Sequence, residues 1–268
     1  MVRDTILCGD NLEMLGTFPD GCFDAGITSP PYNKHVSKNS GGLVKAVDYS
    51  DYSDDMDEME YEDGQVRLLD EIYRVMKDGG SFFYNHKIRW HEGRMLHPLE
   101  WLTKTRWCIR QEIVWNRKLA ANIRGFRFWQ EDERIYWLYK PVDGNMIGDE
   151  MRAAHAKLGS VWDIRPEMDS FHPAPFPLAL PVRCLYSVLD DRKDALVLDP
   201  HMGSGTTAVA CRFLGYGYVG IDVSREYIDR ALERIGDFEM ERDEFEQEYN
   251  RHVSRERKPI SRNDFLFE

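Results

Sequence analysis

The stretch from Ala195 to Asp222 constrains the fold of this chain more than any other feature. An apolar run that ends at Asp199 leads into the turn Gly203-Ser204-Gly205, and residues 206–214 follow with helical spacing. A second apolar run, 218–222, comes next. A strand joined to the next strand through a helix is the unit of a parallel sheet, because the helix crosses one face of that sheet. The stretch therefore predicts an open α/β sheet.

The same alternation of strands and helices runs through most of the remaining chain. Strands are expected at 5–7, 23–28, 81–84, 109–115 and 133–139, and helices at 12–18, 66–76, 98–105, 178–189 and 226–235. Gly79-Gly80 is expected to end the helix before it. Together these segments predict an α/β fold of Rossmann-like type, with a mostly parallel twisted sheet and helices on both faces.

Two segments fall outside this alternation. Residues 34–63 show no period and carry nine acidic residues from Asp48 onward, so we expect a long segment that is either a mobile functional loop or disordered. Residues 237–268 form a charged tail, which is expected to be helical at first and to be a solvated face or a partner surface. We therefore expect one domain at 1–236, followed by the tail.

The composition limits the class of protein. Its 35 Lys and Arg against 47 Asp and Glu give a formal net charge of −12, which argues against a protein that coats nucleic acid non-specifically. No apolar stretch reaches the roughly 20 residues of a membrane span, and Asp4 interrupts the start of the chain before a signal sequence could form. The five cysteines lie far apart, as is typical of reduced thiols. A cytoplasmic protein without a membrane partner is expected.

The glycine turn predicts a nucleotide-like ligand. Glycines let the backbone approach a ligand, the following helix offers free N–H groups, and Asp222 ends the next strand, where a carboxylate can accept both ribose hydroxyls. The turn lacks the Lys of a phosphate-binding loop. Asp199 before the turn would repel phosphate but suits a cation, unless it only initiates the turn. S-adenosylmethionine combines an adenosine with positive charge and no phosphate, and it fits this pattern.

A second motif, Ser29-Pro30-Pro31-Tyr32, directly follows the apolar strand at 23–28. Ligands of open parallel sheets collect beyond the carboxyl ends of the strands, so this motif should face the same crevice as Asp199 and Asp222. Two prolines fix the backbone and leave carbonyl oxygens free to accept hydrogen bonds. A hydroxyl, a rigid carbonyl and an aromatic ring suit a planar base that bears an exocyclic amine.

Both motifs resemble those of the DNA methyltransferases that modify adenine N6 or cytosine N4. Their catalytic motif, (Asp, Asn or Ser)-Pro-Pro-(Tyr or Phe), is matched at residues 29–32, and their cofactor motif, Asp-Pro-Phe-x-Gly-Ser-Gly-Thr-Thr, at residues 199–207. The chain departs from the second motif at His201, where the family usually has Phe. The catalytic motif precedes the cofactor motif, which is similar to the permuted β class, with the target-recognition region between them, here about 86–165.

The resemblance implies a permuted methyltransferase fold and a function for each matched residue. The catalytic residues would be Ser29, Pro30, Pro31 and Tyr32. The residues that bind S-adenosylmethionine would be Asp10, Asp199, Pro200, His201, Gly203, Ser204, Gly205, Thr206, Asp222, His172 and Pro173. The partner would be double-stranded DNA, with a cognate restriction endonuclease as a further candidate, and the enzyme a monomer or a homodimer.

The reaction that this implies is transfer of a methyl group to the amine of a flipped base. Ser29 and the Pro30 carbonyl would hold the amine hydrogens, and Tyr32 would stack on the base. A neutral serine is a poor base, and no residue of the motif stands out as the proton acceptor. The cytosine-N4 members of the family often carry Ser-Pro-Pro-Tyr, so the resemblance implies cytosine N4 in preference to adenine N6, which is the close alternative.

A basic segment in the middle of the chain is the candidate DNA-binding region. Between Lys104 and Arg127, seven Lys and Arg stand against one acid, Glu112, with tryptophan and phenylalanine interleaved. The candidate phosphate contacts are Arg106, Arg110, Arg117, Lys118, Arg124 and Arg127. The alternative is a solvated basic face over a tryptophan-rich core. The loop at 34–63 is hypothesised to order over the flipped base.

Other classes explain less of the sequence. A nicotinamide-dependent oxidoreductase is suggested by Gly-x-Gly-x-x-Ala alone and leaves Ser-Pro-Pro-Tyr unexplained. An RNA methyltransferase is disfavoured by the order of the motifs, and a non-enzymatic DNA-binding protein would require a broken motif. The histidines, including His86, His91 and His97, show no metal-ligand pattern, so no metal is expected.

Overall fold

The computed structural model describes residues 2–33, 56–120, 125–148, 158–167 and 176–253. Its strands are β1 (Thr5–Cys8), β2 (Phe23–Thr28), β3 (Met76–His86), β4 (Arg89–His91), β5 (Arg94–Leu96), β6 (Cys108–Asn116), β7 (Asp132–Tyr139), β8 (Val161–Asp163), β9 (Leu196–Asp199) and β10 (Gly217–Asp222). Its α-helices are α1 (Asn11–Gly16), α2 (Glu58–Val75), α3 (Leu99–Leu102), α4 (Ala179–Leu189), α5 (Thr206–Leu214), α6 (Arg225–Gly236) and α7 (Arg242–Val253).

Eight of the strands form one twisted sheet, and the predicted α/β fold is confirmed. Their order is β1-β10-β9-β2-β3-β7-β6-β8, and β4 pairs with β5 in a separate hairpin. Every pairing in the large sheet is parallel except those of β7 with β3 and with β6. The carboxyl ends of β1, β10, β9, β2 and β3 therefore meet along one edge.

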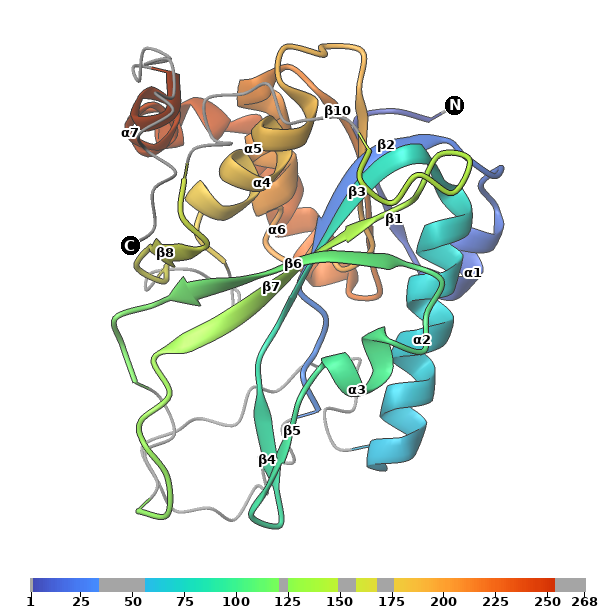
Figure 1. Ribbon diagram of the computed structural model, residues 1–268. Coiled ribbons are helices and arrows are strands. Elements are labelled where there is room, and N and C mark those ends of the chain that lie inside the picture. The colour runs from blue at the N-terminus through green and yellow to red at the C-terminus, as the bar shows by residue number, and fades with distance from the viewer. Residues whose placement is uncertain (1, 34–55, 121–124, 149–157, 168–175, 254–268) are drawn as a thin grey trace, which may run out of the picture.

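Helices cover both faces of the sheet, with α1 and α2 on one side and α4 and α5 on the other (Figure 1). Successive residues of a strand point to opposite faces, which explains the two cores. Phe82 and Leu198 pack with the α1–α2 side, whereas Phe83 and Val197 pack with the α4–α5 side. No helix in the described part of the chain is both long and apolar enough to cross a membrane.

The structure corrects two local predictions. Helix α2 begins at Glu58, with the Asp57 side chain accepting hydrogen bonds from the first turn, so the predicted loop is wrong for residues 58–63. Helix α2 ends at Val75, and Gly79-Gly80 lie inside β3 at a shift of its register with β2 instead of ending the helix. The remainder of the predicted loop, residues 34–55, lies outside the described residues.

The start of the charged tail packs against the domain. Phe245 of α7 is buried in the α4–α5 core, where its ring stacks on Phe213 with 4.5 Å between centroids. Glu248 accepts hydrogen bonds from the buried Arg183 of α4 at 2.7 and 3.1 Å. One face of α7 is therefore part of the core, although the sequence around it is highly charged.

The buried carboxylate of Asp24 in β2 joins this strand to β3, to β9 and to the segment before β9. Asp24 of β2 bonds to Lys77 (2.9 Å), to Arg192 (2.6 Å) and to the Leu196 N–H (2.9 Å). Burial alone would raise the pKa of Asp24, but the hydrogen bonds and charges of these partners outweigh it and lower that pKa.

Replacing Asp24 by Asn should therefore reduce the free energy of unfolding at pH 7 by roughly 2–3 kcal/mol. Because the folded-state pKa is lowered, the stabilisation is present above the unfolded pKa of about 4 and is lost as the pH falls through the folded pKa. Urea unfolding between pH 3 and pH 7 measures both effects. Asp20→Asn, at an exposed ion pair with Arg74, is the control and should change stability by less than about 1 kcal/mol. An equal loss in both variants would contradict the prediction.

Candidate active site

The predicted site residues meet at the edge where the parallel strands end. Asp10 follows β1, Asp222 ends β10 and Asp199 ends β9, while Ser29 follows β2. These four strands are adjacent in the order β1-β10-β9-β2. Residues that lie up to 212 positions apart in the chain (10 and 222) are therefore neighbours along one crevice-forming edge.

Asp199 is the centre of a buried hydrogen-bond network. Its carboxylate accepts from the Thr28 hydroxyl (2.9 Å), the Thr207 hydroxyl (2.5 Å) and the His201 N–H (3.1 Å). Burial raises the pKa of Asp199 to about 6, although these hydrogen bonds oppose the shift. The carboxylate is therefore ionised at neutral pH and becomes protonated at mildly acidic pH.

His201 links this network to the start of helix α1. Its Nε2 lies 2.9 Å from the Asn11 amide nitrogen, and its Nδ1 lies 3.1 Å from the Thr28 hydroxyl. An amide N–H can only donate, so Nε2 is the acceptor and Nδ1 carries the proton. Burial lowers the pKa of His201 to about 4, which keeps the ring neutral. The histidine that replaces the usual phenylalanine is thus fully hydrogen-bonded in this chain.

The glycine turn is held by Asp222 and by helix α6. Asp222 accepts hydrogen bonds from the N–H groups of Gly203 (2.8 Å) and Ser224 (2.9 Å). Gly205 has φ +80°, and a Cβ there would lie 3.1 Å from the Cβ of Ala231 in α6. Only glycine adopts this conformation without strain at such close packing. The turn is therefore packed closely between Asp222 of β10 and Ala231 of α6.

Ser204 and Thr206, which were predicted to bind the cofactor, have side chains that contact helix α6. The hydroxyl groups of Ser204 and Thr206 accept hydrogen bonds from Arg234 of α6 at 3.2 and 2.9 Å. Both residues are buried, as is Pro200. His172 and Pro173 lie outside the described residues.

The side chains at this edge of the sheet suit a positively charged nucleoside. The carboxylates of Asp10, Asp199 and Asp222 lie at the ends of adjacent strands, so a positive charge is favoured there and a pyrophosphate is disfavoured. Two N–H groups of the glycine turn are already bonded within the protein, that of Gly203 to Asp222 and that of Gly205 to the Met202 carbonyl. The acids at this edge therefore fit S-adenosylmethionine, which carries a sulfonium and no phosphate.

Beside these acids, the catalytic motif forms a buried polar cluster with residues from two further strands. The Ser29 hydroxyl lies 2.7 Å from the Tyr32 hydroxyl, which donates to the carboxylate of Glu133 at 3.0 Å. The amide nitrogen of Asn85 lies 3.2 Å from Ser29, 2.9 Å from Tyr32 and 3.2 Å from Glu133. Arg117 pairs with the other oxygen of Glu133 at 2.8 Å.

The side-chain amide oxygen of Asn85 is an acceptor that no other described residue uses. Its nitrogen faces three oxygen atoms, because the opposite orientation would set the amide oxygen against the Glu133 carboxylate. The amide oxygen of Asn85 is buried and has no hydrogen-bond partner among the described residues. A ligand with N–H groups would satisfy this acceptor.

Further residues hold the motif from behind. The Tyr61 hydroxyl donates to the Pro31 carbonyl at 2.7 Å, and the Tyr32 ring packs against His86 with 4.7 Å between centroids. Arg89 donates to the Asn33 carbonyl at 3.0 Å and forms a two-point pair with Glu58. The described part of the chain contains no group of three or more side chains arranged to hold a metal ion.

Asn85, His86 and Glu133 were not among the predicted site residues. Asn85 and His86 end the strand next to β2, so their position after the apolar residues 82–84 was the available signal. Glu133 had no such signal, because it starts the antiparallel strand β7, which sequence analysis assigned to the core.

The basic segment that was predicted to bind DNA is divided between the two ends of strand β6. Arg106 and Arg110 lie near the start of β6, where Arg106 bonds to Asp70 and Arg110 bonds to the Ile147 carbonyl. Arg117 and Lys118 lie past its other end, roughly 23 Å from Arg110 at about 3.3 Å per residue. The structure therefore does not bring these cations together as one stripe.

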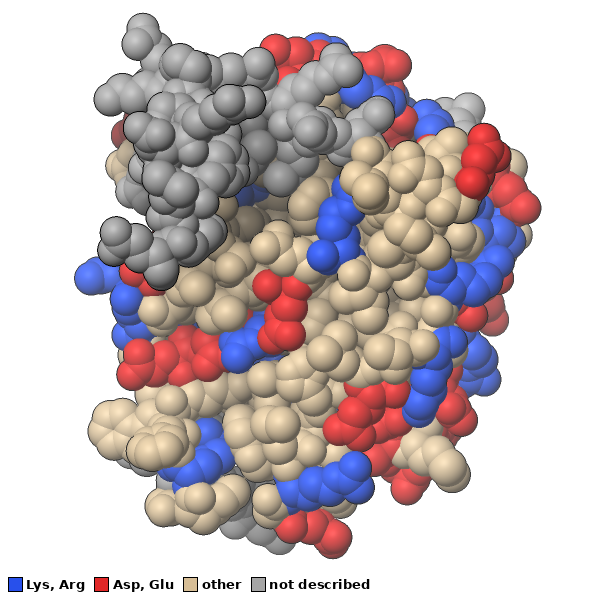
Figure 2. All heavy atoms as spheres, viewed as in Figure 1, with Lys and Arg blue, Asp and Glu red and all other residues tan. Residues whose placement is uncertain are grey.

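The cations at the site end of β6 are partly paired. Lys118 lies 3.0 Å from Asp163, and the Arg127 guanidinium lies over the Trp90 ring at 4.1 Å. Arg124 lies outside the described residues. On the face drawn in Figure 2, the described acidic and basic residues are interspersed, without a broad area of one sign.

The aromatic residues of the same segment separate into two groups. Trp107 and Trp115 are buried and donate to backbone carbonyls of the core. Phe126, Phe128 and Trp129, in the connection between β6 and β7, are exposed, and Phe128 is 99% exposed. The connection that carries them leads directly into the start of β7, at the same end of that strand as Glu133.

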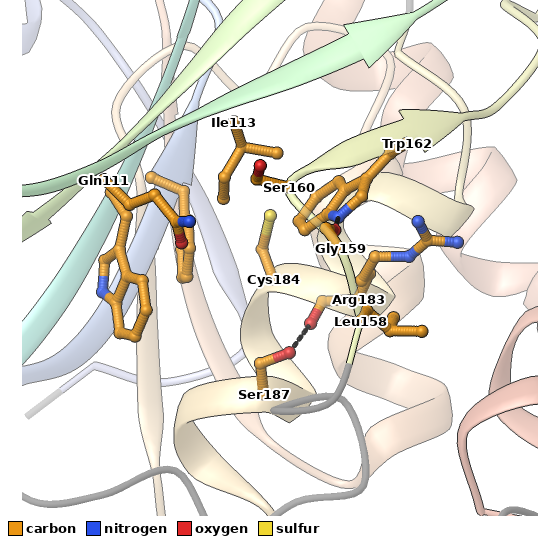
Figure 3. Close-up of a pocket in the computed structure, with 11 residues that line it drawn as sticks. Gln111, Ile113, Leu158, Gly159, Ser160, Trp162, Arg183, Cys184 and Ser187 are labelled. Atoms are coloured by element: carbon orange, nitrogen blue, oxygen red, sulfur yellow. Dashed lines mark hydrogen bonds between the residues drawn. The ribbon is translucent and has the colours of Figure 1, made fainter. Parts of the chain in front are cut away.

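A separate pocket lies between the sheet and α4. Cys184 and Ser187 of α4 line it opposite Gln111 and Ile113 of β6, as Figure 3 shows. Trp162 of β8 also lines it. None of the predicted site residues lines this pocket, so it is distinct from the strand-end site.

An open, mostly parallel sheet with this glycine turn and with acids after adjacent strands defines the class of Rossmann-like methyltransferases. The fold is similar to that of PvuII DNA methyltransferase (cytosine-N4-specific), with a TM-score of 0.71, 18% identity and coverage of 96% of this chain and 94% of that chain. It is also similar to a putative DNA modification methylase from Thermus thermophilus, solved with S-adenosylmethionine, with a TM-score of 0.59, 24% identity and coverage of 87% and 93%.

The sequence comparison places the chain within this class. The type II methyltransferase M.ScaI of Streptomyces caespitosus is 27% identical over 260 residues, which cover 85% of this chain and 79% of that protein. The model of the DNA methylase family of N6 and N4 methyltransferases matches residues 23–233. The chain therefore belongs to this DNA methylase family. This confirms the predicted amino-methyltransferase of DNA, with S-adenosylmethionine as the methyl donor of the family.

Proposed function

We propose that this enzyme methylates the exocyclic amine of a base flipped out of duplex DNA, with cytosine N4 as the target and adenine N6 as the alternative. One observation carries the proposal: the Ser29 hydroxyl lies between the strand-end acids and the Tyr32–Asn85–Glu133 cluster. A base amine held at Ser29 is then adjacent to the edge where a cationic cofactor fits.

The chemistry of an aromatic amine explains why hydrogen-bond acceptors are needed there. The nitrogen lone pair is delocalised into the ring, so the amine is a weak nucleophile. Acceptors at Ser29 and at the Pro30 carbonyl would hold the amine hydrogens and localise the lone pair, and the open oxygen of Asn85 is a further acceptor. The cofactor, when bound, supplies an electrophilic methyl group on its sulfonium. The chain itself would act mainly by orientation.

The base must leave the helix to reach this site, because the amine is paired inside the duplex. The Tyr32 ring is a candidate stacking surface, since His86 packs against it and holds it in place. We propose that residues 86–165 contain the target-recognition region. Lys118, Arg127 and the exposed rings of Phe128 and Trp129 would contact DNA from the site end of that region.

Nucleoside analysis tests the proposed target. The full chain is incubated with duplex DNA of varied sequence and methyl-labelled S-adenosylmethionine, and the digested nucleosides are separated. We expect labelled N4-methylcytosine. Labelled N6-methyladenine would instead establish the alternative, and the absence of label in every DNA would contradict both. We further propose that the enzyme acts in the cytoplasm, as a monomer or homodimer, beside a restriction endonuclease of the same specificity.

Cofactor binding should depend on pH through Asp199. Its pKa is raised to about 6, so the carboxylate that favours a cationic ligand is ionised above this value and is neutralised below it. The dissociation constant for S-adenosylmethionine, measured by calorimetry without DNA, should rise about tenfold between pH 7.5 and pH 5, since about 1.4 kcal/mol of charge interaction corresponds to a factor of ten. In Asp199→Asn the dissociation constant should be higher at pH 7.5 and nearly independent of pH. An equal pH dependence in both proteins would contradict the assignment.

A further inference from the structure

Methylation of an exocyclic amine leaves one proton to be removed, and the motif itself holds no base. The product of attack is a positively charged secondary amine, which must lose a proton to become neutral. Ser29 is neutral and cannot retain that proton. The nearest charged group in the cluster is the carboxylate of Glu133, which comes from β7, far from the motif in sequence.

The hydrogen bonds between Ser29 and Glu133 have a defined direction. An ionised carboxylate only accepts, so the single hydrogen of the Tyr32 hydroxyl is donated to Glu133, over 3.0 Å. The Ser29 hydroxyl, 2.7 Å from the Tyr32 oxygen, must then donate to Tyr32. The lone pairs of Ser29 are thereby left for the Asn85 amide and for one hydrogen of the base amine. The chain of donors points from the base toward Glu133.

Hydrogen bonds and an ion pair hold the Glu133 carboxylate in place. Glu133 is 7% exposed, and burying an unpaired carboxylate to this extent would cost free energy. The guanidinium of Arg117 pairs with one oxygen at 2.8 Å, while Tyr32 and the Asn85 amide donate to the other. Both oxygens are therefore partnered, and one of them faces the motif.

We infer that Glu133 is the terminal acceptor of the proton that the base amine loses, acting through Tyr32 and Ser29. A new N–C bond forms as the C–S bond to the methyl group breaks, and its electron pair stays on sulfur. One proton then passes from the amine to Ser29, the Ser29 proton passes to Tyr32, and the Tyr32 proton passes to Glu133, which becomes neutral and later releases it to solvent. The inference rests on the proposed function. Because the family motif allows Phe at position 32, this route belongs to the residues of this chain.

The test compares Glu133→Gln with the wild type in single-turnover methylation at saturating DNA and S-adenosylmethionine. The variant keeps the size of the side chain and one acceptor oxygen but cannot take up a proton. The methylation rate should fall roughly 100-fold, in the range typical of general bases, while the dissociation constants for cofactor and DNA change less than twofold. Glu131→Gln, at the exposed residue two positions earlier, is the matched control and should keep the wild-type rate.

The pH profile distinguishes proton acceptance from positioning. Saturating cofactor removes the effect of Asp199, and the charged or titratable groups that face Glu133 in the described structure are Arg117 and Tyr32. The wild-type rate should decline toward acid pH with the slope of one proton, and this decline should be absent in Glu133→Gln. A slower variant with an unchanged decline would overturn the inference, and so would a variant with the wild-type rate.

A second variant keeps the inference testable if Glu133→Gln does not fold. Tyr32→Phe retains the ring and the charge of the cluster but removes the relaying hydroxyl, and a comparable loss of rate is expected. The wild-type rate in Tyr32→Phe would overturn the route through Tyr32. These outcomes differ from failure of the proposed function, in which the wild-type enzyme itself would label no amine in DNA.

Discussion

Tyr32→Ala is expected to reduce the single-turnover rate of DNA methylation by a factor of roughly 100 to 1,000, the size of effect that misplaced reacting groups produce. The substitution removes the ring that packs against His86 and the hydroxyl that joins Ser29 to Glu133. Ser29 then loses the partner that directs its lone pairs toward the base. The base itself loses its proposed stacking surface.

The measurement separates this loss from loss of folding. Quenched-flow transfer of the labelled methyl group gives the rate, and calorimetric binding of S-adenosylmethionine gives the integrity of the cofactor site. Cofactor binding should stay within about twofold of wild type, because Asp199 is bonded to Thr28 and Asp222 to the glycine turn, whereas Tyr32 belongs to the cluster of Asn85 and Glu133. A rate within threefold of wild type would contradict the assignment of Tyr32 to the site.

Gly26→Ala is expected to reduce the free energy of unfolding by about 3 kcal/mol, at the upper end of the effects of overpacking. Gly26 lies in the middle of β2, paired with Phe82 of β3 and Leu198 of β9. A Cβ there would lie 2.7 Å from the Leu198 carbonyl oxygen and 2.7 Å from the Phe82 ring. The carbonyl belongs to the sheet backbone and cannot move aside without disturbing the ladder.

The control for this substitution is Gly64→Ala. Gly64 lies inside α2, and a Cβ there would meet nothing within 4 Å. Alanine should therefore stabilise the protein by about 0.5–1 kcal/mol through its helix propensity. For a protein of this size, about 3 kcal/mol corresponds to a decrease in Tm of roughly 6–12 °C. Scanning calorimetry would contradict the prediction if both variants shifted the melting temperature in the same direction.

Much of the sheet was predictable because its signals are local. The apolar runs around Ile27 and Val197, and the turn that contains Gly203 and Gly205, each lie within a few residues, and the structure places strands and a helix start there. The start of α2 was missed because its first turn is dominated by acids, which suggested a loop. The capping carboxylate of Asp57 makes the same residues a helix N-terminus.

The residues of the candidate site likewise include some that are close in sequence and others that only the fold brings together. Ser29 and Tyr32 stand in one short motif, so their proximity was expected. Asn85, Glu133 and Arg117 come from β3, from β7 and from just past the end of β6, and their contact with the motif depends on cross-strand pairing. Nothing near Glu133 in sequence indicates that its side chain meets a hydroxyl 101 positions away.

The sequence by itself determined the order of most strands and helices, though not of β4, β5 and β8, and the two motifs at the strand ends, because periodicity and turn chemistry act between neighbouring residues. Only the tertiary structure decided which charges act together. It divides the basic segment between the two ends of β6, because an extended strand separates Arg110 from Arg117, and it joins Arg117 through Glu133 to Tyr32, because adjacent strands align their ends. Charge along the chain is therefore a poor guide to this site, whereas the register of the sheet places each of its groups.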